Sequence, residues 1–159
     1  GMKAIGLQVC LDNIWNKMIE NYKKGKRTWL YCDEFHLLTQ TEISAKYTQQ
    51  IWRRARKWNG IPTGITQQVE DMMKTEEGRA IIGNSEFVMM LQMNPYGRAQ
   101  MQQMYNLTDA EMEYITSSGS GHGLIYNGKD IIPFIDEFPR DTKLYKAMTT
   151  KVGEGEVRQ

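Results

Sequence analysis

The chain has 159 residues, of which 40% are hydrophobic and 25% are charged, which suits one globular domain and excludes a disordered chain. Its formal net charge of +1 excludes the global basic field that dominates nonspecific nucleic-acid binding, although local basic patches remain open. The sequence shows no signal-peptide pattern and no apolar run of the roughly 18 residues that cross a membrane. Cys10 and Cys32 are expected to be reduced core residues, which favours the cytoplasm.

Helical and strand patterns alternate in the first part of the chain. Apolar residues recur at three- and four-residue spacing over residues 7–22, which predicts a helix of about four turns packed on a sheet. Residues 28–32 predict a buried strand. A second helix is expected to be capped by Thr39 or Thr41 and to end before Asn59-Gly60. Its expected buried face contains Ile43, Tyr47, Ile51, Ala55 and Trp58.

The alternation continues to the end of the chain. Residues 61–66 and 86–92 predict two more strands, and short helices are expected at 69–73, 76–83, 99–105 and 142–148. Thr108 and Glu111 form a capping box that opens a further helix. Apolar runs on both sides of Asn127-Gly128 predict a β-hairpin over residues 123–135. These patterns together predict an α/β fold, with a mainly parallel sheet flanked by helices and a C-terminal antiparallel β-hairpin.

Two adjacent carboxylates, Asp33 and Glu34, directly follow the first predicted strand. In open α/β folds, ligand crevices lie at the carboxyl ends of the strands. Acids at such an edge suit a magnesium ion and a water molecule, because one acid can hold Mg²⁺ indirectly while the next orients or deprotonates the water. This arrangement is typical of a Walker B motif. Solvated acids after a strand would produce the same pattern.

Four stretches, residues 29–36, 53–60, 64–68 and 121–125, together resemble the conjugative-transfer ATPases of type IV secretion systems, which belong to the FtsK/HerA group of P-loop motor proteins. The resemblance covers roughly residues 5–152 and matches the later part of such an ATPase domain. It implies a partial P-loop ATPase domain over residues 1–152, from the Walker B motif to the hairpin, followed by a flexible tail over residues 153–159.

The resemblance also implies roles for individual residues. Asp33 resembles the acid that holds Mg²⁺, through water, and Glu34 resembles the catalytic glutamate. Gln67 resembles the polar sensor of the γ-phosphate. Arg56 or Arg54 resembles the arginine that reaches from one subunit of a hexameric ring into the neighbouring nucleotide site. The implied cofactors of the intact protein are ATP and Mg²⁺.

One part of the family pattern is missing, because no Gly-x-x-x-x-Gly-Lys-Ser/Thr segment occurs in the sequence. The chain is therefore expected to be a C-terminal portion, shortened artificially or by truncation of the gene, and to bind no nucleotide by itself. In the resembled family the phosphate-loop strand lies between the strand ending at Thr66 and the strand containing Val88. Its loss should either bring those strands together or make one of them borrow a strand from another copy.

The resemblance implies three kinds of partner: other copies in a hexameric ring, secretion-channel components and DNA. It places the protein in the cytoplasm or peripherally at the inner face of the membrane. Two rival interpretations stay open. One is an inactive interaction module that assembles with an intact homologue, and the other is a DNA-binding domain that uses the basic patch at residues 53–57.

Three remaining features favour structural explanations. The glycine-rich residues 117–123 lack a lysine and a following helix, which favours a connecting loop over a phosphate site. His36 and His122 lack metal-ligand spacing, so we expect solvent contacts rather than a metal site with Asp33 or Cys32. The methionines are expected to be mostly core residues. Those considered are Met72, Met73, Met89, Met90, Met101 and Met104.

Overall fold

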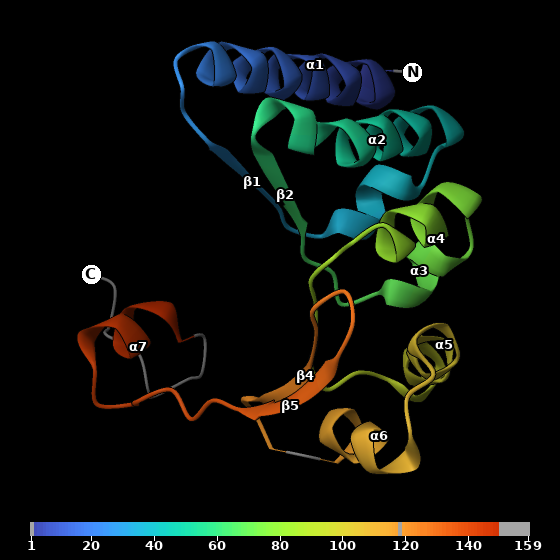
Figure 1. Cartoon of the computed structure of the whole chain (residues 1–159), viewed down its shortest axis with the longest axis vertical. Helices are drawn as coiled ribbons and strands as arrows, with labels where there is room; N and C mark the ends of the chain where they lie inside the picture. The colour runs from blue at the N-terminus through green and yellow to red at the C-terminus, as the bar shows by residue number, and fades with distance from the viewer. Residues whose placement is uncertain (1, 118, 150–159) are drawn as a thin grey trace.

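The computed structural model of the chain describes residues 2–117 and 119–149, and the tail expected at residues 153–159 lies outside them (Figure 1). The first part contains α1 (Met2–Lys23), β1 (Thr28–Cys32), the 3-10 helix η1 (Phe35–Thr39), α2 (Glu42–Arg54), the 3-10 helix η2 (Ala55–Trp58) and β2 (Gly60–Gly64). The second part contains α3 (Val69–Met73), α4 (Glu76–Gly83), β3 (Val88–Met90), α5 (Pro95–Tyr105), α6 (Asp109–Thr116), β4 (His122–Tyr126), β5 (Ile131–Ile135) and α7 (Lys143–Met148).

The strands form two separate sheets. β1 and β2 pair in parallel, whereas β3, β4 and β5 form an antiparallel sheet in that order. The expected α/β class with a C-terminal antiparallel hairpin is confirmed. Of the two outcomes expected for the strands on either side of the absent phosphate-loop strand, direct pairing does not occur, since in the described residues β3 hydrogen-bonds to β4 and β2 to β1. Figure 1 shows the two sheets apart, joined through α3 and α4.

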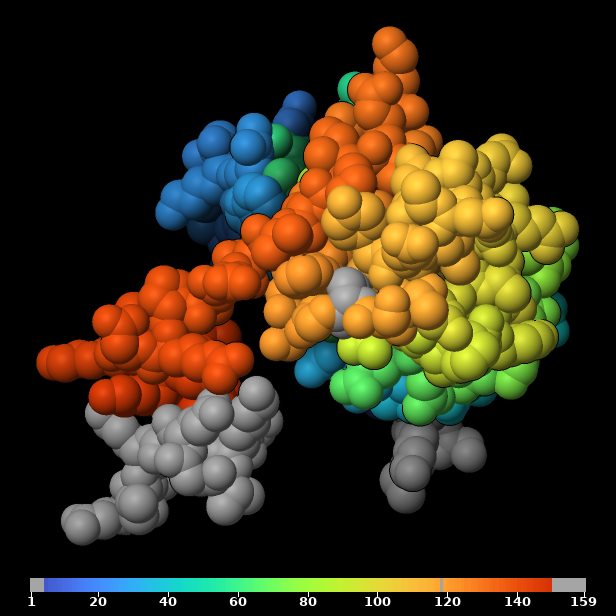
Figure 2. Space-filling model, turned by 90° about the horizontal axis from the view of Figure 1, so that it is seen from below, coloured from blue at the N-terminus to red at the C-terminus, as the bar shows by residue number. Residues whose placement is uncertain are grey.

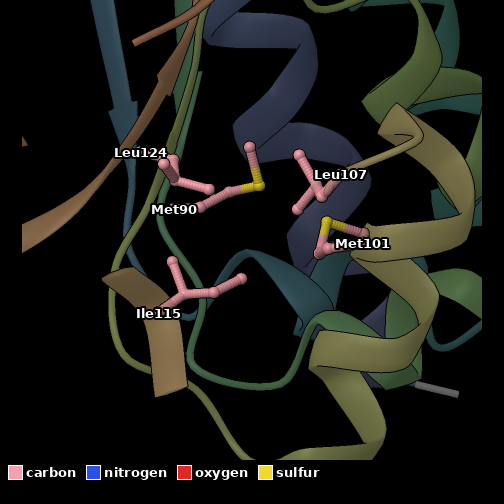
Figure 3. Close-up of a cluster of buried hydrophobic side chains, with 5 residues drawn as sticks. All are labelled: Met90, Met101, Leu107, Ile115 and Leu124. Carbon is pink, nitrogen blue, oxygen red and sulfur yellow. The ribbon is translucent and has the colours of Figure 1, made fainter. Parts of the chain in front are cut away.

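The antiparallel sheet and two helices enclose one of the two hydrophobic clusters (Figure 3). Met90 and Leu124 point inward from paired positions of β3 and β4, and α5, α6 and the turn between them supply the facing side chains. A capping box at Thr108 and Glu111 fixes the start of α6, as predicted. This cluster consists of Met90, Met101, Leu107, Ile115 and Leu124.

The expected inward face of α1 is mostly correct, since Leu11 and Met18 are buried. Tyr22, at the end of the same pattern, is exposed. The prediction that Cys10 is a core residue is wrong, because Cys10 lies on the outer face of α1 and is exposed. Cys32 is partly buried, and both cysteines are free thiols, as expected. Burial raises the pKa of the Cys32 thiol.

The predicted buried face of the second helix is confirmed at Ile51 and Ala55, whereas Tyr47 and Trp58 are only partly buried. Ile43 is 66% exposed, and small residues take the place expected for large ones. Because η1, α1 and α4 all approach α2 closely, the small side chains of Ser44, Ala45 and Thr48 are buried there beside Ile51. Thr41 caps the helix by accepting the Ser44 amide hydrogen, whereas Thr39 is buried and donates to the carbonyl of His36. The buried residues of α2 are Ser44, Ala45, Thr48 and Ile51.

Several apolar side chains of the sheets lie on uncovered faces. Trp29 and Tyr31 of β1 are stacked with ring centroids 6.4 Å apart and are both more than half exposed. The prediction of a strand at residues 28–32 is confirmed, but its expected burial is wrong, because alternate residues of β1 are exposed and helices cover only one face of this sheet. Met89 is likewise exposed, unlike the other methionines named above. Figure 2 shows the segment carrying α7 projecting from the body of the molecule, and no residue of α7 is buried.

Candidate functional site

The candidate site lies where β1 and β2 end side by side. Because the strands are parallel, their carboxyl ends meet at one edge, and the register pairs Cys32 with Gly64. Two backbone hydrogen bonds continue the pairing beyond the strands. The Ile65 amide donates to the Cys32 carbonyl, and the Phe35 amide donates to the Ile65 carbonyl, each at 2.8 Å. The loops after β1 and β2 are thereby held in contact.

Phe35 anchors the first of these loops. Its ring is 1% exposed and lies 4.6 Å, centroid to centroid, from the ring of Trp52 in α2. It belongs to the second hydrophobic cluster, with Met72, Ile81 and Ile82. Because this ring is packed in the cluster, it fixes the backbone positions of its neighbours Glu34 and His36.

Asp33 and Glu34 both lie at this edge, as the sequence predicted. Asp33 is exposed, and its Oδ1 accepts the Glu34 amide hydrogen at 2.9 Å. Glu34 adopts a left-handed backbone conformation, with φ 47° and ψ 45°. Residues other than glycine rarely adopt this conformation, and it costs on the order of 1 kcal/mol. The Glu34 carboxylate is 47% exposed and lies beside the ring of His36.

His36 is the site residue that sequence reasoning placed wrongly. Only 6% of its surface is exposed, so the expected solvent contacts are almost absent. Its Nδ1 lies 3.4 Å from Glu34 Oε2 and 3.2 Å from Thr66 Oγ1. The available signal was its position inside an otherwise apolar run from Phe35 to Leu38. Among the described residues, no group of three histidine, cysteine or acidic side chains could hold a metal ion.

The loop after β2 carries the remaining residues of the edge. Thr66 Oγ1 accepts the Gln68 amide hydrogen at 3.1 Å, which closes a tight turn around Gln67. Gln67 is exposed, and the described part of the chain supplies no hydrogen-bond partner that would fix its amide. The edge therefore presents Asp33, Glu34 and Gln67 to solvent, with His36 and Thr66 beneath them.

Arg54 and Arg56 lie at the opposite end of this sheet. Arg54 ends α2, and Arg56 lies in η2, which leads directly into the beginning of β2. Five strand residues at about 3.3 Å each separate the two ends by about 16 Å. Arg56 Nη1 lies 3.3 Å from Glu86 Oε1, but the two side chains are 90% and 83% exposed. Such a pair contributes about 0 to 1 kcal/mol.

Two cavities lie between α1 and α2, and neither is lined by Asp33 or Glu34. The larger has a volume of about 130 Å³ and lies between α1 and α2, lined by Trp15, Tyr47, Gln50, Ile51 and Arg54. The other, of about 10 Å³, also lies between these helices. The candidate site is an open edge, at which the side chains of Asp33 and Gln67 are exposed to solvent.

The donor set at this edge fits part of a magnesium site. Oδ2 of Asp33 has no hydrogen-bond partner among the described residues, which leaves it able to hold an ion directly or through water. Mg²⁺ commonly takes one or two carboxylates and completes its shell with waters and substrate phosphates. Residues 117–123, considered above for phosphate, connect α6 to β4 in their described part. Gly121 there has φ +89° and sits where a side chain would meet the Asp136 carbonyl.

The fold is that of an open α/β domain, a class that binds ligands at the carboxyl edge of its parallel strands, and here that edge carries two acids. The structure is similar to VirB4 of Thermoanaerobacter pseudethanolicus, with a TM-score of 0.72 and 26% sequence identity over 80% of this chain. That match covers 35% of the VirB4 chain, so this chain spans about a third of its length. No curated protein matches the sequence.

The sequence matches the TraG P-loop domain over residues 4–151, and the chain belongs to this family. The resemblance to ATPases of conjugative transfer and type IV secretion is thus confirmed. No helix in the described part of the chain combines the length and apolar character needed to cross a membrane.

Proposed function

We propose that this chain is the Walker B-containing part of a conjugative-transfer motor ATPase of the FtsK/HerA group. In the intact protein, ATP hydrolysis would power substrate transfer or assembly of a secretion channel. The observation that carries the proposal is the meeting of Asp33, Glu34 and Gln67 at one edge of a parallel sheet in a TraG P-loop domain. Such an edge is where α/β proteins bind ligands.

Each residue has a distinct task in this mechanism. Asp33 would hold Mg²⁺ through water, and the ion would neutralise charge on the phosphates. Glu34 would orient the attacking water and accept its proton. Gln67, free at the tip of its turn, would hydrogen-bond the γ-phosphate. The phosphate-binding loop must come from a segment that residues 1–159 do not contain.

The position of Arg54 and Arg56 supports action on a neighbouring subunit. About 16 Å of strand separates them from Glu34, so neither guanidinium can reach a phosphate held at the site of its own chain. In a ring, the far end of one sheet can face the acidic edge of the next copy. The proposed partners are therefore other copies in a hexameric ring, together with channel components, in the cytoplasm or at the inner face of the membrane.

Calorimetry tests whether nucleotide binding needs the phosphate-binding loop in addition to the residues of this chain. Residues 1–159 alone should show no micromolar binding of Mg-ATP, whereas the intact ATPase, meaning a longer chain that adds the phosphate loop, should bind and hydrolyse it. Glu34→Gln in the intact ATPase should keep nucleotide bound and lose hydrolysis. Micromolar binding by residues 1–159 would contradict this assignment, and so would an intact chain without ATPase activity.

A second candidate function, DNA binding, is favoured by a surface that the fold assembles from two distant segments. Arg27 Nε donates to Asn59 Oδ1 at 3.3 Å, which places residues 23–27 beside residues 53–57. The two segments carry eight exposed cations and no acid, so the rest of this +1 chain carries −7. Partly buried Trp58 and exposed Tyr22, 5.4 Å apart, lie between them and offer rings for stacking. The cations are Lys23, Lys24, Lys26, Arg27, Arg53, Arg54, Arg56 and Lys57.

Fluorescence anisotropy with DNA oligonucleotides at several salt concentrations tests this surface. Each phosphate contact to duplex DNA adds about −0.9 to the slope of log K against log salt. The double variant Lys26→Glu, Arg27→Glu should weaken binding and flatten that slope. The matched control Lys143→Glu, Lys146→Glu makes the same charge change on α7 and should leave binding near wild type. Equal losses in both variants would argue against a defined DNA surface.

The remaining alternative is an inactive module that assembles with an intact homologue. It uses the same ring contacts but needs no chemistry from Glu34. Mixing residues 1–159 with an intact homologue distinguishes it, because an inactive module would enter the rings and change their activity.

A further inference from the structure

His36 is a buried polar side chain for which the mechanism above has no task. Its ring is held from two sides between the loops that follow β1 and β2. Nδ1 lies 3.4 Å from Glu34 Oε2 and 3.2 Å from Thr66 Oγ1. The residue itself is fixed in η1, where its carbonyl accepts the Thr39 hydroxyl at 2.9 Å. The ring therefore has little freedom to leave this position.

The acceptors around Nδ1 determine which hydrogen-bonding role it takes. An ionised carboxylate can only accept, and Thr66 Oγ1 retains acceptor capacity in addition to the Gln68 amide hydrogen that it already takes. Both contacts are satisfied when Nδ1 carries the hydrogen and shares it between Glu34 and Thr66. The tautomer with hydrogen on Nε2 would instead turn a lone pair toward the carboxylate, which is unfavourable.

This arrangement connects the two halves of the exposed edge. Glu34 stands on the loop after β1, and Thr66 holds the turn that carries Gln67 on the loop after β2. A movement of that turn displaces Thr66 and, through His36, the carboxylate of Glu34. The exposed half of Glu34 has no other side-chain partner among the described residues. Without the histidine, the carboxylate could rotate into solvent.

We propose that His36 is a positioning residue, which orients the Glu34 carboxylate toward the attacking water and couples it to the loop that carries Gln67. The inference rests on the proposed function, because it assigns His36 a task in the same site. His36 does not touch the substrate itself, since its ring lies beneath the exposed edge. Its effect is on the catalytic step rather than on nucleotide affinity.

Steady-state kinetics of the intact ATPase tests the proposal. His36→Ala should lower kcat about 10- to 100-fold, as small displacements of a catalytic group do, and should leave the Kd for Mg-ATP unchanged. His36→Asn keeps a hydrogen-bond donor at the position of Nδ1 and should restore most of the rate. His36→Gln places its amide at the position of Nε2 and should not. Thr66→Val, which replaces the hydroxyl with a methyl group of similar size, should reproduce part of the loss.

His122→Asn is the matched control, because His122 begins β4 away from this edge and should tolerate the change with an unaltered rate. Circular dichroism identifies any variant that fails to fold. If His36→Ala is one of these, the comparison of His36→Asn with His36→Gln decides the matter. Equal rates for these two variants, or a wild-type rate for His36→Ala, would overturn the inference.

The failure of the inference can be distinguished from failure of the proposed function. An inactive wild-type intact ATPase would overturn the proposed function and the inference that rests on it. An active wild type with an inactive Glu34→Gln variant and a fully active His36→Ala variant would overturn only the inference. Nitrogen-15 NMR of residues 1–159 gives an independent reading, since hydrogen on His36 Nδ1 is expected and hydrogen on Nε2 alone would contradict the proposed geometry.

Discussion

The ring of Phe35 lies so close to Gly64 that a Cβ on Gly64 would stand 2.8 Å from Phe35 Cγ. Gly64 ends β2, and Phe35 begins η1 directly after the Asp33-Glu34 turn. The missing side chain of Gly64 is therefore what allows the two loops of the candidate site to approach each other. Phe35 cannot move aside readily, because its ring is buried against Trp52.

Gly64→Ala should consequently destabilise residues 1–159. Forcing a methyl group into a packed site typically costs about 1 to 3 kcal/mol. Urea unfolding measures the change. Gly6→Ala is the control, since the added Cβ in α1 meets nothing within 4 Å and should be neutral or stabilise by about 0.5 to 1 kcal/mol. A Gly64→Ala variant as stable as wild type would show that the Phe35 ring is free to shift.

The pH dependence of stability above pH 10 should depend on Tyr105. Burial, with a smaller contribution from Tyr126, raises the pKa of Tyr105 to about 12. Between pH 10 and pH 12 the unfolded chain would ionise this phenol while the folded chain keeps it neutral. The free energy of unfolding should therefore fall as pH rises through this range.

Urea unfolding at fixed pH, combined with absorbance at 295 nm, tests this dependence. Tyr105→Phe should lose less stability than wild type between pH 10 and pH 12, and the difference between the two proteins should be constant below pH 9. Part of the loss should remain in the variant, because the pKa of Tyr47 is also raised to about 12. Identical pH profiles would show that Tyr105 ionises as readily in the folded state as in the unfolded state.

A mixing experiment with the intact ATPase should distinguish an arginine that acts on a neighbour from one that acts within its own chain. Glu34→Gln and Arg56→Ala should each abolish turnover, the first while Mg-ATP stays bound. In mixed rings, the arginine of a Glu34→Gln subunit can face the intact glutamate of an Arg56→Ala subunit. Mixing should therefore restore part of the activity.

ATPase rates of both single variants and of their mixture decide the role of Arg56, provided that subunit exchange is confirmed. An arginine acting within its own chain gives no recovery on mixing. An arginine that only contacts DNA leaves basal hydrolysis nearly intact. Full basal activity of Arg56→Ala would rule out the assignment and make Arg54 the next position to test.

The unpaired edges and uncovered faces of the two sheets should make residues 1–159 associate. Within residues 2–117 and 119–149, β2 pairs only with β1, and β3 pairs only with β4. The apolar side chains of Trp29 and Met89 are 55% and 52% exposed on these sheets. Exposed strands and apolar faces of this kind recruit further strands or copies.

Sedimentation velocity at increasing protein concentration measures this association. Trp29→Lys and Met89→Lys should each reduce it. Ile43→Lys makes the same change at a 66% exposed position of α2, outside both sheets, and should have little effect. A monodisperse monomer at all concentrations would contradict the expectation that this part of the domain borrows a strand.

The sequence by itself determined the features that depend on local patterns. Helical spacing, the capping box at Thr108 and Glu111, and the Asn127-Gly128 turn each involve neighbouring residues, so their structural meaning does not depend on the rest of the fold. The same holds for Asp33 and Glu34, because a strand that ends in two acids delivers them to the edge of its sheet wherever that sheet lies.

Only the tertiary structure decided the features that require two distant segments to meet. The sequence could not show that His36 is buried against Thr66, because 30 residues separate them and their contact depends on the pairing of β1 with β2. Nor could it show that β3 pairs with β4 of the hairpin and not with β2, since an apolar strand has the same sequence pattern next to either of these strands. Pairing and burial are properties of the whole fold, and sequence periodicity reports only which side of an element is apolar.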